Sequence, residues 1–181
     1  IGSVASIFVS RIDSAIDKRL DKLGDKPLAD RLRGKAAIAN AKLAYLRYKT
    51  LFSGARWQTL AAAGAKTQRL LWASTSTKNK AYSDVLYVET LIGPNTINTM
   101  PPETLEAYRD HGKPEATLEQ NIDQARQTLD EFKQVGLSLD RATDELTVEG
   151  VEKFEEAATK LFAAIREKSA KLSGTAANAA E

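Results

Sequence analysis

Short apolar runs alternate with longer segments of helical spacing through the first hundred residues of the chain. The runs are rich in β-branched and aromatic side chains, which predicts short strands at residues 3–9, 70–74 and 96–100. Apolar residues recur at helical spacing between these runs, which predicts helices at 12–23, 35–52 and 57–63. Because strands joined by helical crossovers form parallel sheets, the pattern predicts an α/β fold.

Two local signals refine this pattern. Residues 82–91 fit either a strand or a buried helix, and Ser83 with Asp84 favours the helix because these side chains can cap its first turn. Gly24 followed by Pro27 predicts the end of the first helix.

From Pro101 onward the pattern becomes almost wholly helical, beginning with a helix at 103–109. Two further helices each carry an apolar stripe, which is typical of core contacts. The stripes consist of Leu118, Ile122, Ala125, Leu129 and Phe132, and of Val151, Phe154, Ala158, Leu161, Phe162 and Ile165. Residues 173–181 are rich in small side chains, and we expect this tail to fray.

Composition and charge narrow the function classes. The 181 residues are 43% apolar and 28% charged, which is typical of a globular domain with a real core. The 26 basic and 24 acidic residues give a net charge of only +2, so neither nucleic acid nor an anionic membrane is an expected partner. No apolar run approaches the roughly 20 residues that span a bilayer, and we expect a cytoplasmic location.

Several kinds of site are disfavoured by residue content. Cysteine is absent, which excludes disulfides, thiolate metal sites and cysteine nucleophiles within this sequence. The single histidine, His111, precedes Gly112 and Pro114, so we expect it at the end of a helix, where a cation is favourable. A histidine-rich metal site or a Ser-His-Asp triad is not expected.

Hydroxyl and basic side chains follow two of the predicted strands. Ser10 and Arg11 end the first, and a run from Ser74 to Lys78 ends the second. Because parallel strands deliver their carboxyl ends to one edge, these groups predict an anion pocket, with phosphate as the expected ligand. The alternative is that the hydroxyls only cap the helices that follow.

Three segments stand out along the chain: SVASIFVSRID at 3–13, LWAST at 71–75 and GPNTINTMP at 93–101. Together they resemble transaldolase, in particular the longer bacterial type that is also found fused to glucose-6-phosphate isomerase. They occur in the family's order, and the resemblance extends over nearly the whole chain. It implies a class I aldolase-type (β/α)8 TIM barrel of which this chain is the C-terminal portion, with the last three strands, six to eight, followed by additional helices.

The resemblance also implies the organisation of the chain. Residues 1–112 would be the partial barrel, 113–172 helices packing on it, and 173–181 the frayed tail. The chain begins almost inside a predicted strand, so we expect that it was cut from a longer protein whose N-terminal barrel portion is its partner.

The activity implied by the resemblance is transfer of a dihydroxyacetone unit between sugar phosphates in the pentose phosphate pathway, without a cofactor. The sugar phosphates are sedoheptulose 7-phosphate, fructose 6-phosphate, erythrose 4-phosphate and glyceraldehyde 3-phosphate. The family's phosphate-binding residues carry over to Ser6, Arg11 and Ser74, with Phe8 lining the pocket. Short transaldolases place an arginine just after the second serine, whereas the first cation here is Lys78, which could bind phosphate or be a solvated loop residue.

The resemblance implies that the catalytic lysine is missing. That lysine forms a Schiff base from the fourth strand, so we expect it upstream of Ile1. Lys35, Lys42 and Lys49 follow one another at spacings that predict an exposed helix edge, and none is a convincing substitute. We therefore expect the parent protein to be active and the isolated chain to be inactive. The alternative is a non-enzymatic helical binding or scaffold module.

Overall fold

The computed structural model describes the backbone of residues 1–178 and the side chains of residues 1–173. The chain divides into two compact units, Ile1–Ala142 and a second that begins at Thr143. In order, the elements of the first unit are β1 (Ser3–Phe8), α1 (Val9–Leu20), α2 (Lys26–Leu32), α3 (Ala36–Leu51), α4 (Ala55–Ala62), β2 (Gln68–Ala73), α5 (Leu86–Thr90), β3 (Thr96–Asn98), α6 (Pro102–His111) and α7 (Ile122–Gln134).

The three strands form one parallel sheet in the order β1-β2-β3. Ser6 of β1 lies opposite Leu71 of β2, which in turn lies opposite Ile97 of β3. Helices occupy both crossovers, as a parallel arrangement requires. The predicted α/β fold with a parallel sheet is therefore confirmed, and the ambiguous segment at 82–91 contains a helix, α5.

The two faces of the sheet differ in burial. Leu70 and Trp72 are buried, and the Trp72 indole donates to the carbonyl oxygen of Leu91 at the end of α5. The alternate positions of β1 carry Val4, Ser6 and Phe8, which are exposed. Because successive side chains of a strand point to opposite faces, helices cover one face and leave the other open within the described residues.

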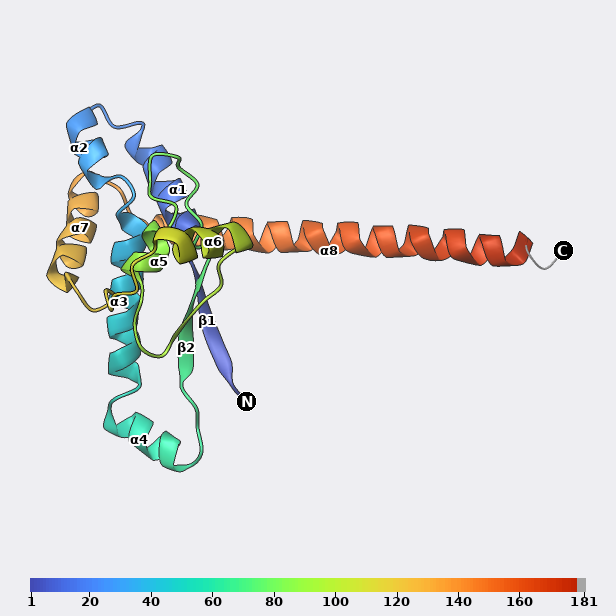
Figure 1. The fold of residues 1–181 in the computed structure, drawn as a ribbon, viewed down its shortest axis with the longest axis horizontal. Coiled ribbons are helices and arrows are strands. Elements are labelled where there is room, and N and C mark those ends of the chain that lie inside the picture. Colours follow the sequence, from blue (N-terminus) through green and yellow to red (C-terminus); the bar gives the residue numbers. More distant parts are fainter. Residues whose placement is uncertain (179–181) are drawn as a thin grey trace. The chain divides into compact units, whose positions relative to one another are not determined.

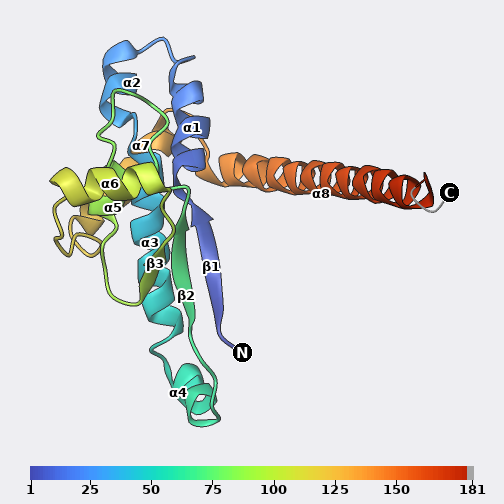
Figure 2. The same ribbon diagram turned by 45° about the vertical axis from the view of Figure 1, so that its right-hand side comes forward.

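Helix α3 is the centre of the helical layer. It packs against α1 and α7 and lies alongside β2 in both views of the ribbon (Figures 1 and 2). Ala37 and Ala41 on α3 are fully buried, and side chains this small allow neighbouring elements to approach closely. Ile16 and Leu20 of α1 and Phe132 of α7 are also buried. Leu118 and Ala125 are buried as well, which confirms that the stripe predicted at 118–132 contributes to the core.

Helix α2 is absent from the sequence-based prediction. Pro27, which together with Gly24 predicts the end of the preceding helix, lies in the first turn of α2, where its missing N–H costs nothing. Asp25 caps this helix by accepting a hydrogen bond from the Leu28 backbone N–H at 3.0 Å. The Gly-x-x-Pro signal therefore both ends one helix and begins the next.

Helix α8 (Leu139–Asn178) begins in the first unit, and from Thr143 onward it forms the second unit. The predicted core contacts of its stripe are not observed, because Val151, Phe154, Leu161, Phe162 and Ile165 are each between 54% and 69% exposed. Helical spacing places apolar residues on one face but does not supply a surface to cover them. In the predicted tail, residues 173–178 continue α8, and 179–181 lie outside the described residues. None of the helices described is both long and apolar enough to cross a membrane.

Candidate functional site

The carboxyl ends of β1 and β2 are joined by one serine pair. The Ser10 backbone N–H donates to the Ser74 carbonyl oxygen at 3.1 Å, and the two hydroxyl oxygens lie 2.9 Å apart. Ser10 is buried, so the contact fixes the position of both hydroxyls. The structure thus brings the two hydroxyl-bearing strand ends together at one edge of the sheet.

Ser74 has an unusual backbone conformation. Its φ of 58° lies in the left-handed region, which costs a non-glycine residue roughly 1–3 kcal/mol. Such residues persist where surrounding contacts hold them, and they are frequent at binding sites. Here the paired backbone and side chain of Ser10 provide those contacts.

Arg11 lies in the first turn of α1, directly beyond the end of β1. Its guanidinium carbon is 4.2 Å from the centroid of the exposed Phe8 ring, which is cation–π geometry. Phe8 is the N-cap residue of α1 and makes no side-chain capping bond. The partial positive charge of the helix N-terminus therefore lies beside the Arg11 charge.

The remaining predicted site residues are less closely joined. Ser6 is exposed on the open face of β1, two residues before Phe8 and opposite Leu71. Lys78 is exposed, and its ammonium donates to the Ser76 hydroxyl at 2.8 Å. That local contact keeps Lys78 within its own loop, close in sequence to Ser74.

A second polar contact, which the sequence did not reveal, joins the segment after β2 to the end of β3. Thr75 is fully buried, and its hydroxyl donates to the Asn98 side-chain oxygen at 2.8 Å. The Thr99 backbone N–H also donates to the Trp72 carbonyl oxygen at 3.0 Å. Both segments had been singled out in the sequence, but their pairing depends on the order of the strands.

Asp13 on α1 is a buried carboxylate with two partners. It accepts from the Ala37 backbone N–H at 2.8 Å and from the Tyr87 hydroxyl at 2.7 Å. Burial raises the pKa of Asp13 to about 6, even though these two hydrogen bonds oppose the shift. Because Ala37 lies in the first turn of α3, Asp13 caps that helix from a neighbouring helix.

Asp17, one helical turn later, makes a similar pair of contacts. It accepts from the Gly34 backbone N–H at 3.1 Å and from the Tyr82 hydroxyl at 2.5 Å. Gly34 has a φ of +70°, and a Cβ there would lie 2.8 Å from the Tyr82 ring. Burial and the Asp17 carboxylate both raise the pKa of Tyr82, so its hydroxyl stays a donor.

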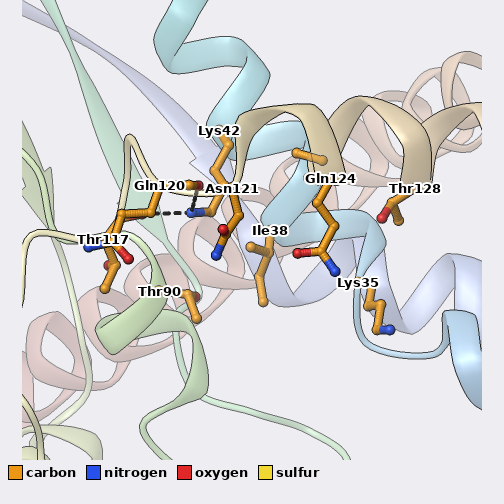
Figure 3. Close-up of a pocket in the computed structure, with 11 residues that line it drawn as sticks. Lys35, Ile38, Lys42, Thr90, Thr117, Gln120, Asn121, Gln124 and Thr128 are labelled. Atoms are coloured by element: carbon orange, nitrogen blue, oxygen red, sulfur yellow. Dashed lines mark hydrogen bonds between the residues drawn. The ribbon is translucent and has the colours of Figure 1, made fainter.

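Lys42 was expected on an exposed helix edge, and this expectation is wrong. The side chain is buried, at 7% exposure, and it donates to the carbonyl oxygens of Thr117 and Gln120 at 2.6 and 2.8 Å (Figure 3). Desolvation lowers the pKa of Lys42. The spacing of Lys35, Lys42 and Lys49 could not show this burial, because its partners lie some 75 residues later in the sequence.

Lys42 also borders a cavity of about 270 Å³ whose other lining residues come from α3 and its N-cap, from α5, from the segment leading into α7 and from α7 itself. Figure 3 shows Ile38, Gln124 and Asn121 around it. The cavity lies within the helical layer, whereas the serine pair lies at the carboxyl edge of the sheet. It therefore belongs to a different part of the first unit.

His111 is the last residue of α6, as predicted. It pairs with Asp84 at 2.9 Å and with Asp110 at 3.1 Å, and hydrogen bonding to Asp84 and then to Asp110 raises the pKa of its imidazole. Within the described residues, no group of three or more His, Cys, Asp or Glu side chains is placed to hold a metal ion.

Comparison with known proteins identifies the family. Residues 1–165 match the family model described as Transaldolase/Fructose-6-phosphate aldolase. A transaldolase of Parafrankia sp. (strain EAN1pec) is 54% identical over 168 residues, which cover 92% of this chain and 45% of that protein. A transaldolase of Trichodesmium erythraeum (strain IMS101) is 48% identical, covering 95% of this chain and 48% of that protein.

A third relative, Transaldolase 2 of Streptomyces coelicolor, is 51% identical over 158 residues, which cover 87% of this chain and 42% of that protein. The chain therefore spans about half the length of the relatives that it matches. These matches confirm the resemblance found in the three sequence segments, and they show that the chain belongs to the transaldolase/fructose-6-phosphate aldolase family.

Proposed function

We propose that this chain is the phosphate-binding part of a transaldolase, and that β1, β2 and β3 are strands six to eight of a (β/α)8 barrel. The parallel order and the helices on one face support this assignment. In a barrel of this kind the face away from the helices points inward, and ligands bind at the carboxyl ends of the strands. The division into a barrel portion at 1–112 and helices at 113–172 stays a prediction.

The observation that carries the proposal is the contact between Ser10 and Ser74. It brings Ser74, held in a left-handed conformation, beside the first turn of α1, which carries Arg11. A phosphate at this edge would meet a hydroxyl, a guanidinium and a helix N-terminus, which are all favourable to an anion. Ser6 and Phe8 would lie on the inner wall below it, and Lys78 would add a point charge from the loop.

The reaction we propose for the complete enzyme is transfer of a dihydroxyacetone unit between sugar phosphates. A lysine amine attacks the ketose carbonyl, water leaves, and the resulting Schiff base accepts the electrons of the broken carbon–carbon bond. Donors would be sedoheptulose 7-phosphate or fructose 6-phosphate, and acceptors erythrose 4-phosphate or glyceraldehyde 3-phosphate. The pentose phosphate pathway and a cytoplasmic location follow from this proposal as predictions.

We further propose that the Schiff-base lysine belongs to the part of the family's length that this chain does not span. Lys42 is the strongest competitor within residues 1–173, because it is buried and has a lowered pKa. Its ammonium, however, donates to two carbonyl oxygens, which stabilise the protonated form. Its position on α3, in the helical layer, also separates it from the proposed phosphate site.

Borohydride trapping tests whether the Schiff-base lysine lies outside this chain. The 181-residue chain and the full-length transaldolase of which we propose it is part are each treated with fructose 6-phosphate and borohydride. We expect a mass increase in the full-length protein only. Trapping in the isolated chain would overturn the proposal that the nucleophile is missing, and the Lys42→Ala variant would show whether Lys42 is the residue modified.

A second candidate function, a non-enzymatic helical binding or scaffold module, is favoured by one observation. The apolar stripe of α8 is exposed, including Phe154 and Leu161. Exposed apolar surface of this kind can bind a partner. Failure to trap an imine in the full-length protein would favour this second function over the first.

A further inference from the structure

We propose that Asp17 and Tyr82, supported by Asp13 and Tyr87, are positioning residues that hold the segment between β2 and α5 against α1 and so set the geometry of the phosphate site. We call this segment, residues 74–85, the β2–α5 segment. The inference rests on the proposed function, because it concerns the same phosphate site.

Helix α1 carries both residues of the proposed phosphate site and the two carboxylates that bind the tyrosines. Ser10 and Arg11 lie in its first turn, and Asp13 and Asp17 follow on the same helix, one turn apart from each other. A helix of this length moves as one body, so a contact that fixes Asp17 also fixes the position of Arg11. The Asp–Tyr contacts therefore act on the site through α1.

The β2–α5 segment is attached to α1 on both sides of Lys78. Ser74 is held by Ser10 at the start of the segment, and Tyr82 is held by Asp17 near its end. In both ribbon views the segment that follows β2 runs beside α1 (Figures 1 and 2). Two attachment points on one helix restrict the loop between them, which contains the hydroxyls and the lysine of the proposed site.

The position of Tyr82 is fixed by several other groups. Gly34 approaches the Tyr82 ring so closely that a Cβ would collide with it, and the Gly34 backbone N–H donates to the same Asp17 carboxylate. Tyr82 also closes a turn by donating its backbone N–H to the Asn79 carbonyl oxygen at 3.1 Å. The phenol, the carboxylate and the glycine together define one position for this part of the segment.

Asp13 and Tyr87 form a second pair of the same kind, and this pair is more deeply buried. Tyr87 lies in the first turn of α5 and donates to Asp13, which is 1% exposed. A buried carboxylate is costly unless it is satisfied, and here it also caps α3. The proposed reaction makes no direct use of this pair, so holding α1, α3 and α5 together is the role that its contacts support.

The test uses the full-length transaldolase with the Tyr82→Phe substitution, which removes one hydroxyl and keeps the ring. We expect KM for fructose 6-phosphate to rise about three- to tenfold with little change in kcat, because the lost contact weakens ground-state phosphate binding. Inhibition by inorganic phosphate should weaken by the same factor, whereas kcat/KM for unphosphorylated fructose should not change. Asp17→Asn should give the same pattern, and the double variant should be no worse than either alone.

Tyr45→Phe is the matched control, because it removes a tyrosine hydroxyl that donates to the Pro94 carbonyl oxygen at 3.1 Å in the same unit. It should leave both substrates and the phosphate inhibition unchanged. An equal loss with fructose and fructose 6-phosphate, or no kinetic change in Tyr82→Phe, would overturn the positioning role.

Arg11→Ala separates this failure from failure of the proposed function. If Arg11→Ala raises KM for fructose 6-phosphate and Tyr82→Phe does not, the phosphate site stands and the positioning role is wrong. If neither variant changes KM or phosphate inhibition, the phosphate site itself is misplaced.

Discussion

Helices α1 and α8 have the same kind of apolar pattern but opposite burial. Ile12, Ile16 and Leu20 on α1 are buried, whereas Phe154 and Leu161 on α8 are more than half exposed. The polar faces differ too. Asp13 and Asp17 of α1 bond to other elements, whereas α8 forms ion pairs within itself, such as Glu156 with Lys160. A periodic stripe thus predicts a helix, and its partners decide whether that helix stabilises the fold.

The largest expected effect tests the burial difference directly. Ile16→Ala should lower the free energy of unfolding of the chain by about 3 kcal/mol, because it removes fully buried methyl groups and leaves a cavity in the core. Leu161→Ala on α8 should change it by less than about 0.5 kcal/mol. Urea unfolding followed by tryptophan fluorescence measures both, and equal losses would contradict the comparison.

The next effect concerns the buried carboxylate on α1. Because burial raises the pKa of Asp13 from 3.8 to about 6, the folded state binds this proton more tightly than the unfolded state. The contribution of Asp13 to stability is therefore fully present below pH 4 and is lost as pH rises through 6. The difference between pH 4 and pH 7 is about 2 kcal/mol, since one pKa unit corresponds to about 1.4 kcal/mol.

The Asp13→Asn variant isolates this contribution. The amide oxygen can still accept from Ala37, and the amide N–H₂ can donate to the Tyr87 hydroxyl, so the packing is retained. The groups facing Asp13 are Tyr87 together with Asp17 and Tyr82, and the variant leaves all three in place. Subtracting its urea-unfolding profile at pH 4–7 from that of the original chain should leave the expected fall, and a flat difference would exclude it.

An effect of similar size is expected at Gly34, where backbone strain and a side-chain collision coincide. Gly34→Ala should cost about 2 kcal/mol, because it forces a positive φ on alanine and drives a Cβ into the Tyr82 ring. Gly64→Ala shares the positive φ but meets no atom within 4 Å, so it should cost only about 1 kcal/mol. Thermal unfolding of the two variants separates the effect of the collision from that of the backbone strain. Equal decreases in unfolding temperature would show that the Tyr82 ring moves aside without an energetic cost.

Sequence patterns predicted the elements well where the signal was local. The β-branched runs gave all three strands of the described sheet, and the wide alanine-rich face at 35–52 gave α3 within one residue at each end. The strand ends that carry Ser10 and Ser74 were expected to lie at one edge of a parallel sheet, and the structure places these two hydroxyl oxygens 2.9 Å apart. Helix α2 was missed because a proline that follows the end of one helix can also lie in the first turn of the next, as Pro27 does.

Contacts between distant segments could not be predicted in the same way. The burial of Lys42 depends on carbonyl oxygens at Thr117 and Gln120, and the role of Asp13 depends on the start of α3 and on Tyr87. Each is a charged residue whose helical position looked solvent-facing or unremarkable. Charge and spacing indicate on which face of its helix a residue lies. Its burial depends on which other element packs against that face.

The smallest expected effect lies on the polar face of α8, where Glu156 and Lys160 form an i,i+4 pair at 3.7 Å. Glu156→Gln removes the attraction, which is worth about 0.3 kcal/mol for an exposed pair and is screened by salt. Helix content near the midpoint of thermal unfolding, measured by circular dichroism, should fall slightly at low salt and be unchanged at 1 M NaCl. A salt-independent loss of more than 1 kcal/mol would mean that Glu156 has a partner as specific as those of Asp13 and Asp17, and the contrast between the polar faces of α1 and α8 would no longer hold.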